Sequence, residues 1–123
     1  MIAIGKNILE TRVLVMGVTF KENVSDIRNS KVVDIINELK DFGVSVDVMD
    51  PCADIDEVYR EYGFRLIEKP GNDYDAVIVA VAHDEYKVLE EEYFLNLTRE
   101  SAVLGDVKGI YRGKIHKLKY WSL

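Results

Sequence analysis

Residues 75–82 read DAVIVAVA and contain the longest apolar run of the sequence. A strand that is apolar on both faces is typical of the centre of a parallel sheet, where helices cover both sides. Shorter apolar runs rich in β-branched residues predict further buried strands. These predicted strands lie at 12–18, 44–49 and 102–107, with a weaker one at 64–68 and an edge strand at 120–123.

Three segments between these strands have the pattern of helices. Ser30 is a candidate N-cap, and the apolar residues between it and Phe42 fall on one helical stripe. Gly43 then has the position of a C′ glycine that ends the helix. Shorter helices are expected at 54–62 and at 84–97, the second in two pieces.

The order of these elements decides the fold class. Strands alternate with helices, which predicts an α/β fold: three layers, α/β/α, around a mainly parallel, Rossmann-like sheet of five to six strands. In such open sheets, ligands bind beyond the carboxyl ends of the strands. The loops expected there are 17–29, 50–54, 82–85 and 106–112, and their residues are the candidates for a binding site.

Composition excludes several classes of protein. The chain has 123 residues, of which 48% are hydrophobic and 31% charged, as in one compact globular domain. Sixteen basic against 22 acidic residues give a net charge of −6, which argues against nucleic-acid and anionic-membrane partners. One cysteine, no apolar run of membrane-spanning length and no signal peptide pattern predict a cytoplasmic protein.

Two familiar site patterns are incomplete in this sequence. The loop after the first predicted strand has Gly17 alone, whereas the dinucleotide fingerprint needs three glycines. Asp50 stands where a ribose-binding acid would, although Asp50-Pro51 is more simply the start of a turn. Cys52 is flanked by Asp50 and Asp54, whose charges would raise the pKa of its thiol, so an inert or surface thiol is expected.

The two histidines, His83 and His116, have no partner at the spacing of a metal site, so no metal is predicted. His83 nevertheless follows the predicted central strand at its carboxyl end. Two interpretations stay open for it: a role in binding, or a solvated or capping side chain.

The loop at 19–30 collects the residue types that bind phosphate. Lys21 could hold phosphate oxygens as a point charge and Arg28 as a fork, with Asp26 orienting either base. Phe20 could lie against a ring, and Ser30 opens a helix whose amides favour an anion. The alternative is a solvated loop in which Asp26 and Arg28 form a local ion pair.

Residues 13–23 (VLVMGVTFKEN) and 26–30 (DIRNS) resemble the opening of the C-terminal domain of the UDP-glucose/GDP-mannose dehydrogenase family. The family pattern is a strand, a glycine, Phe-Lys and then Asp-x-Arg-x-Ser. Further matches follow at Gly43, Asp50-Pro51, 75–77 and 106–108, so the resemblance covers nearly the whole chain from about Arg12. The stretch AVAHDEY at 80–86 is most similar to the branch that oxidises UDP-N-acetylhexosamines, the Vi-antigen and capsule type.

This resemblance implies a function and a set of roles. The family oxidises C6 of a nucleotide sugar from alcohol to carboxylate for polysaccharide biosynthesis, with two NAD molecules and a catalytic cysteine. By matching position, Phe20, Lys21 and Lys108 would bind the UDP-sugar, and Arg28 would reach the NAD phosphates. Asp26 would orient the basic pair. Lys108 stands where many relatives have arginine, which leaves its role open.

The sequence lacks the glycine fingerprint and a cysteine in the family's catalytic context. We therefore expect residues 12–123 to be the UDP-sugar-binding C-terminal domain and 1–11 the tail of a linker from a missing central region. NAD would be bound mainly by a missing N-terminal domain, the parent would be a homodimer, and this chain alone would be inactive. The alternative is a free-standing nucleotide-binding or regulatory module without catalysis.

Overall fold

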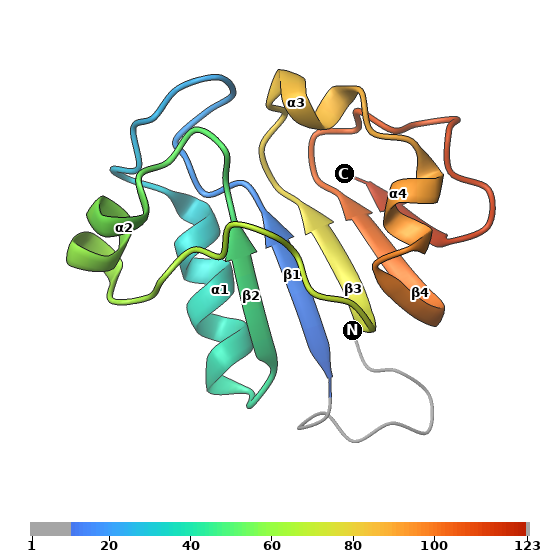
Figure 1. The fold of residues 1–123 in the computed structure, drawn as a ribbon, viewed down its shortest axis with the longest axis horizontal. Helices are drawn as coiled ribbons and strands as arrows, with labels where there is room; N and C mark the ends of the chain where they lie inside the picture. The colour runs from blue at the N-terminus through green and yellow to red at the C-terminus, as the bar shows by residue number, and fades with distance from the viewer. Residues whose placement is uncertain (1–10, 123) are drawn as a thin grey trace.

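The computed structural model describes residues 11–122 as a five-stranded sheet with helices on both faces (Figure 1). The strands lie in the order β2-β1-β3-β4-β5, and every neighbouring pair is parallel. The elements are β1 (Arg12–Met16), α1 (Lys31–Asp41), β2 (Ser45–Met49), α2 (Ile55–Tyr62), β3 (Tyr74–Val79), α3 (Asp84–Lys87), α4 (Glu91–Leu95), β4 (Thr98–Asp106) and β5 (Lys119–Ser122). The three-layer, Rossmann-like fold expected from the sequence is confirmed.

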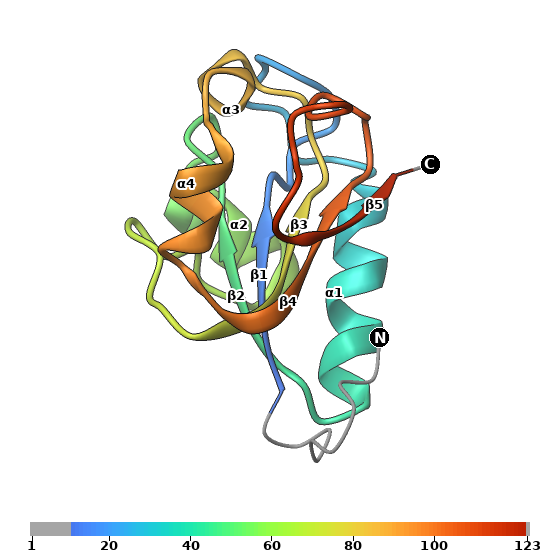
Figure 2. The ribbon, with the colours of Figure 1, turned by 90° about the vertical axis from the view of Figure 1, so that its right-hand side faces the viewer.

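Two apolar clusters hold the layers together. Alternate side chains of β1 point to opposite faces, so Val13 and Val15 pack in one cluster and Leu14 and Met16 in the other. The first cluster lies against α1 and α2, and the second lies against α3 and α4. Figure 2 shows α1 and α4 on opposite sides of the sheet. Burial on both faces explains why the central strands read as continuous apolar runs.

One predicted strand is absent from the described part of the chain. Residues 64–68 form no ladder, and Ile67 makes a single backbone bond, donating its N–H to the carbonyl of Val48 at 2.8 Å. Phe64 and Leu66 are buried in the α1-side cluster, so the alternation that suggested a strand comes from an extended segment covering the edge of β2. The sheet therefore has five strands rather than six.

Other expectations are confirmed, with shifted ends. The segment 84–97 contains the two short helices α3 and α4, and β5 is a parallel edge strand. β4 begins at Thr98, earlier than predicted. Tyr74 pairs with Thr98 and Ala76 pairs with Val103, so a register shift between these two pairs includes the polar residues 99–101 in the strand. Ser101 takes the left-handed conformation within this irregularity, with φ of 62°.

All five strands point the same way, so their carboxyl ends meet at one edge of the sheet (Figure 1). The loops 17–29, 50–54 and 80–83 lie there, and the connection 107–118 starts there before it returns to the amino end of β5. Gly17 allows the first of these loops to leave β1 sharply, since its φ is 101° and an added Cβ would lie 2.7 Å from Cβ of Val81.

Thr11 is the one residue of the expected linker tail that the structure describes; residues 1–10 lie outside the described residues. Thr11 is buried, and its carbonyl accepts the N–H of Ser45 at 3.1 Å. None of the helices in the described range has the length and apolar character needed to cross a membrane.

Candidate functional site

Asp50, the first residue after β2, fastens the loop that follows β1. The side chain is buried, and its Oδ2 accepts the N–H groups of Val18 at 2.7 Å and Thr19 at 3.1 Å. Its Oδ1 accepts the N–H of Cys52 at 2.8 Å, which forms the turn expected at Asp50-Pro51. Since both oxygens are used internally, this carboxylate is not free to bind a ribose.

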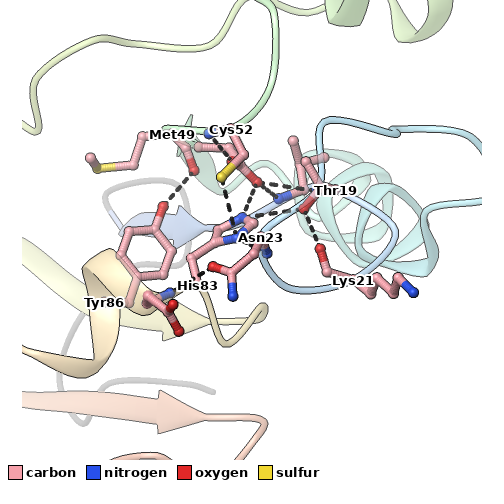
Figure 3. Close-up of polar contacts among 10 residues, drawn as sticks. Thr19, Lys21, Asn23, Met49, Cys52, His83 and Tyr86 are labelled. Atoms are coloured by element: carbon pink, nitrogen blue, oxygen red, sulfur yellow. Dashed lines mark hydrogen bonds and ion pairs between the residues drawn. The ribbon is translucent and has the colours of Figure 1, made fainter.

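His83 lies at the centre of the same network and is fully buried (Figure 3). Its Nε2 is 3.0 Å from Oδ2 of Asp50 and 3.2 Å from Oγ1 of Thr19. Its Nδ1 accepts the N–H of Asn23 at 2.9 Å. Because a backbone N–H can only donate, Nδ1 carries the lone pair, and Nε2 carries the proton that it donates to Asp50.

The structure corrects both interpretations that the sequence left open for His83. The ring is not solvated, and it makes no capping hydrogen bond to α3 although it occupies the N-cap position. It is also out of direct reach of a ligand, since none of its surface is exposed. Its partners come from the loops after β1 and β2, so it joins three loops at the carboxyl edge of the sheet.

Asp50, Cys52 and His83 form a cluster of possible metal ligands that sequence spacing did not reveal, with one ligand atom of each within 4.8 Å of the others. The lone pair of Nδ1 already accepts the N–H of Asn23, and both carboxylate oxygens accept N–H groups. Sγ of Cys52 lies 3.5 Å from Nδ1. The donor set therefore serves a hydrogen-bond network and does not present an open coordination site.

The Cys52 thiol has a raised pKa, as the sequence predicted, but the causes differ. Burial raises it most, followed by the charges of Glu85 and Asp50. Asp54, named from sequence adjacency, instead caps α2 by accepting the N–H of Glu57 at 2.9 Å. A thiol with a raised pKa stays protonated at neutral pH, which makes it a poor nucleophile.

Phe20 and Lys21 project from the network into solvent. Phe20 is 55% exposed, unusual for a large apolar ring, and Lys21 is exposed. Figure 3 shows the Lys21 side chain extending away from the His83 cluster. Within residues 11–122, no carboxylate lies at ion-pair distance from the Lys21 ammonium. This loop tip therefore offers an apolar ring and an uncompensated cation side by side.

The far part of the loop holds the second basic residue. Arg28 donates from Nε to Oδ1 and from Nη2 to Oδ2 of Asp26, both at 3.0 Å, with its side chain 80% exposed. The ion pair expected in the alternative interpretation therefore exists. Asp26 orients Arg28, but within the part of the chain that the structure describes it makes no hydrogen bond or ion pair with Lys21, so it does not orient the two bases together. Ile27, which separates Asp26 and Arg28 in the sequence, is buried, and its carbonyl accepts a hydrogen bond from the Tyr62 hydroxyl.

Ser30 and Lys108, two other candidates, behave differently. Ser30 occupies the N-cap position of α1 but makes no capping bond, and its buried Oγ has no partner among the described residues. The predicted N-cap position is therefore confirmed, but the capping hydrogen bond expected of it is absent.

Lys108 is exposed in the connection after β4, at the same edge of the sheet as Lys21.

A cavity of about 420 Å³ lies beside this network on the α3 and α4 face. Met16, Leu66 and Tyr86 are among its apolar walls, and Glu68 and Glu85 are its charged residues besides Asp50. Carboxylates repel phosphate groups, so an anionic ligand is favoured at the Phe20–Lys21 tip and not in this cavity.

The Asp26–Arg28 pair has a measurable signature. The hydrogen bond from Arg28 lowers the pKa of Asp26 from 3.8 to about 2. Because the pKa is lower in the folded state, the stabilisation is complete above 3.8 and is lost as the pH falls through about 2. We expect the Asp26 carboxyl to titrate near 2 by NMR and to return toward its ordinary range in Arg28→Ala. An unchanged titration in that variant would contradict the assigned pair.

Fold and site together define a class: an α/β domain that lacks the dinucleotide glycine loop and presents a basic, partly aromatic loop at the ligand edge of its sheet. Residues 14–113 match the model of the "UDP-glucose/GDP-mannose dehydrogenase family, UDP binding domain". The chain belongs to this family, and the resemblance noted in the sequence is confirmed.

Individual relatives agree with this assignment. The chain is 41% identical over 109 residues to UDP-N-acetyl-D-glucosamine 6-dehydrogenase of Salmonella typhi, covering 88% of this chain and 26% of the relative. It is 45% identical over 98 residues to the enzyme of the same name from Pseudomonas aeruginosa, covering 79% and 23%. The chain thus spans about a quarter of the length of these relatives.

Solved structures support the fold. The NDP-N-acetyl-D-galactosaminuronic acid dehydrogenase of Methanosarcina mazei superposes with a TM-score of 0.80 at 20% identity, covering 96% of this chain and 25% of that one. The UDP-N-acetyl-mannosamine dehydrogenase Cap5O of Staphylococcus aureus gives 0.73 at 24% identity, covering 94% and 27%.

Proposed function

We propose that this chain is the nucleotide-sugar-binding domain of an NAD-dependent dehydrogenase that oxidises the C6 hydroxyl of a UDP-N-acetylhexosamine to a carboxylate for polysaccharide biosynthesis. The observation that carries the proposal is the exposed Phe20–Lys21 tip on a buried hydrogen-bond network. Relatives at 41% and 45% identity are named UDP-N-acetyl-D-glucosamine 6-dehydrogenases, which supports this substrate class over a regulatory module without catalysis.

In this proposal, each exposed residue of the loop has a role set by its chemistry. The Lys21 ammonium neutralises the diphosphate of the UDP-sugar, because no carboxylate among residues 11–122 pairs with it. The Phe20 ring lies against the uracil base. Lys108 supplies a second cation from the connection after β4, as a point charge and without the fork of an arginine.

NAD accepts the hydride in the proposed reaction, and this chain provides only one contact for it. The loop after β1 has no glycine-rich pyrophosphate cradle, and the Asp50 oxygens are engaged. Arg28 fits a phosphate contact, because Asp26 holds its Nε and Nη2 while the rest of the exposed guanidinium stays available. The rest of the NAD site and the catalytic cysteine would belong to other parts of the enzyme.

The test is the affinity for UDP, measured by calorimetry on the 123-residue chain. Lys21→Ala removes one charge-assisted phosphate contact, so we expect a loss of about 1.5–3 kcal/mol, which is tenfold or more in Kd. Lys69→Ala is the matched control, because Lys69 is an exposed lysine in the connection between α2 and β3 and is not part of the loop after β1. Equal affinities of Lys21→Ala and the unmodified chain would refute the role of Lys21.

The dehydrogenase part of the proposal is tested on the full-length protein that contains this sequence. We expect it to reduce NAD when it is given a UDP-N-acetylhexosamine, and the Lys21→Ala change to raise KM for that substrate. Comparison of UDP-N-acetylglucosamine, UDP-N-acetylmannosamine and UDP-glucose identifies the sugar. Absence of NAD reduction with every UDP-sugar would favour the regulatory module instead.

A further inference from the structure

We infer that His83 is a positioning residue for the phosphate-binding loop: it fixes Thr19 and Asn23, on the two sides of Lys21, and so presents the lysine in one place. The inference rests on the proposed function of Lys21 as a phosphate contact. It assigns a ligand-directed role to a side chain that no ligand can touch, since His83 is fully buried.

The hydrogen bonds around His83 form one consistent set. Nε2–H lies between two acceptors, Oδ2 of Asp50 at 3.0 Å and Oγ1 of Thr19 at 3.2 Å. The Thr19 hydroxyl then donates its own proton to the carbonyl of Lys21 at 3.0 Å. On the other side of the ring, Nδ1 accepts the N–H of Asn23 at 2.9 Å. Each proton has an acceptor, and the chain of bonds ends on the backbone of Lys21.

Asn23 forms the turn that follows Lys21. Its φ is 60°, in the left-handed region, which asparagine enters more readily than most residues other than glycine. Two contacts maintain it: its N–H is bound by His83, and its Oδ1 accepts the N–H of Asp84 at 2.9 Å. Removal of the His83 acceptor leaves this turn with the Asp84 contact alone, so residues 20–22 are held less firmly at one of their two ends.

The ring itself has little freedom to move. It packs edge-on against Tyr86 with centroids 5.5 Å apart, and its two nitrogens are bound on opposite sides. A loop that is ordered before binding loses less conformational entropy when a ligand arrives. Because the fixed ring orders the loop around Lys21, it raises the affinity of the domain for UDP without touching the ligand.

Two substitutions distinguish the hydrogen bond of His83 to Asn23 from its hydrogen bond to Asp50. His83→Asn can place an amide oxygen near the position of Nδ1 and accept the N–H of Asn23, but it cannot reach Asp50. His83→Gln can place an amide N–H near the position of Nε2 and donate to Asp50, but it leaves the N–H of Asn23 without an acceptor. Comparison of the two variants shows which of these two hydrogen bonds fixes the position of the loop.

The test is a double-mutant cycle on UDP affinity in the 123-residue chain. We expect His83→Gln to weaken UDP binding about threefold to tenfold, and His83→Asn to weaken it less. In the Lys21→Ala background, His83→Gln should cause no further loss, because the residue acts through Lys21. Additive losses, or a folded His83→Gln variant with unchanged affinity, would overturn the inference. If Lys21→Ala itself has no effect, the proposed function has failed instead.

A measurement on the unmodified chain keeps the inference testable if both variants fail to fold. Nitrogen NMR of the imidazole should show the proton on Nε2, and the amide of Asn23 should exchange slowly with solvent before UDP is added. A proton on Nδ1, or an Asn23 amide that becomes protected only when UDP binds, would contradict a loop positioned in advance by His83.

Discussion

Replacement of Asp50 by alanine is expected to lower the free energy of unfolding by about 3–5 kcal/mol. The carboxylate is buried and has four donors: the N–H groups of Val18, Thr19 and Cys52, and Nε2 of His83. Alanine leaves the three backbone N–H groups without this acceptor, and Nε2 of His83 keeps only Oγ1 of Thr19. Each unsatisfied buried group costs about 1–3 kcal/mol before the structure relaxes. Urea denaturation of the two chains measures the difference.

Asp54→Ala is the matched control for this change. Asp54 is four residues away and exposed, and it accepts one bond, from the N–H of Glu57 at the start of α2. Loss of such an N-cap costs about 1 kcal/mol. If Asp50→Ala is no more destabilising than Asp54→Ala, the buried network does not hold the loop after β1 in the way described.

The order of strands and helices could be predicted because buried strands and helices have characteristic patterns of apolar residues. β1 and β3 are apolar on both faces, and α1 has one apolar stripe ended by Gly43, so strand, helix and parallel sheet followed from periodicity. The segment 64–68, which was predicted as a strand, has alternating burial without forming a ladder. Alternating burial records that a segment is extended against a core, but not whether a neighbouring strand pairs with it.

The part of the candidate site that faces solvent could be predicted from the sequence, since Phe20, Lys21, Asp26 and Arg28 lie in the polar loop that follows the first strand. The buried part could not. Asp50 and His83 are 33 residues apart, and their contact depends on the register of β1, β2 and β3 and on side-chain rotamers. One signal was available: both residues follow parallel strands that end at the same edge, which places their loops close together.

The carboxylate of Asp106, the last residue of β4, holds the connection that follows β4 by hydrogen bonds, as Asp50 holds the loop that follows β1. It is fully buried and accepts the N–H groups of Ile110 at 3.0 Å and Tyr111 at 2.7 Å, and the hydroxyl of Tyr120 at 2.5 Å. These bonds fasten the connection that carries Lys108 and tie β5 to it. Lys108 therefore depends on Asp106 for its place at the ligand edge.

We expect Asp106→Ala to lower the free energy of unfolding by about 2–4 kcal/mol and to speed hydrogen exchange through residues 107–122. Tyr120→Phe is the graded control: it removes one of the three donors and should cost about 1 kcal/mol. Denaturation separates the two variants in total stability, and hydrogen exchange locates the loss. Exchange that speeds equally in β1 and in the connection would show that Asp106 supports the whole sheet and does not specifically hold Lys108 in place.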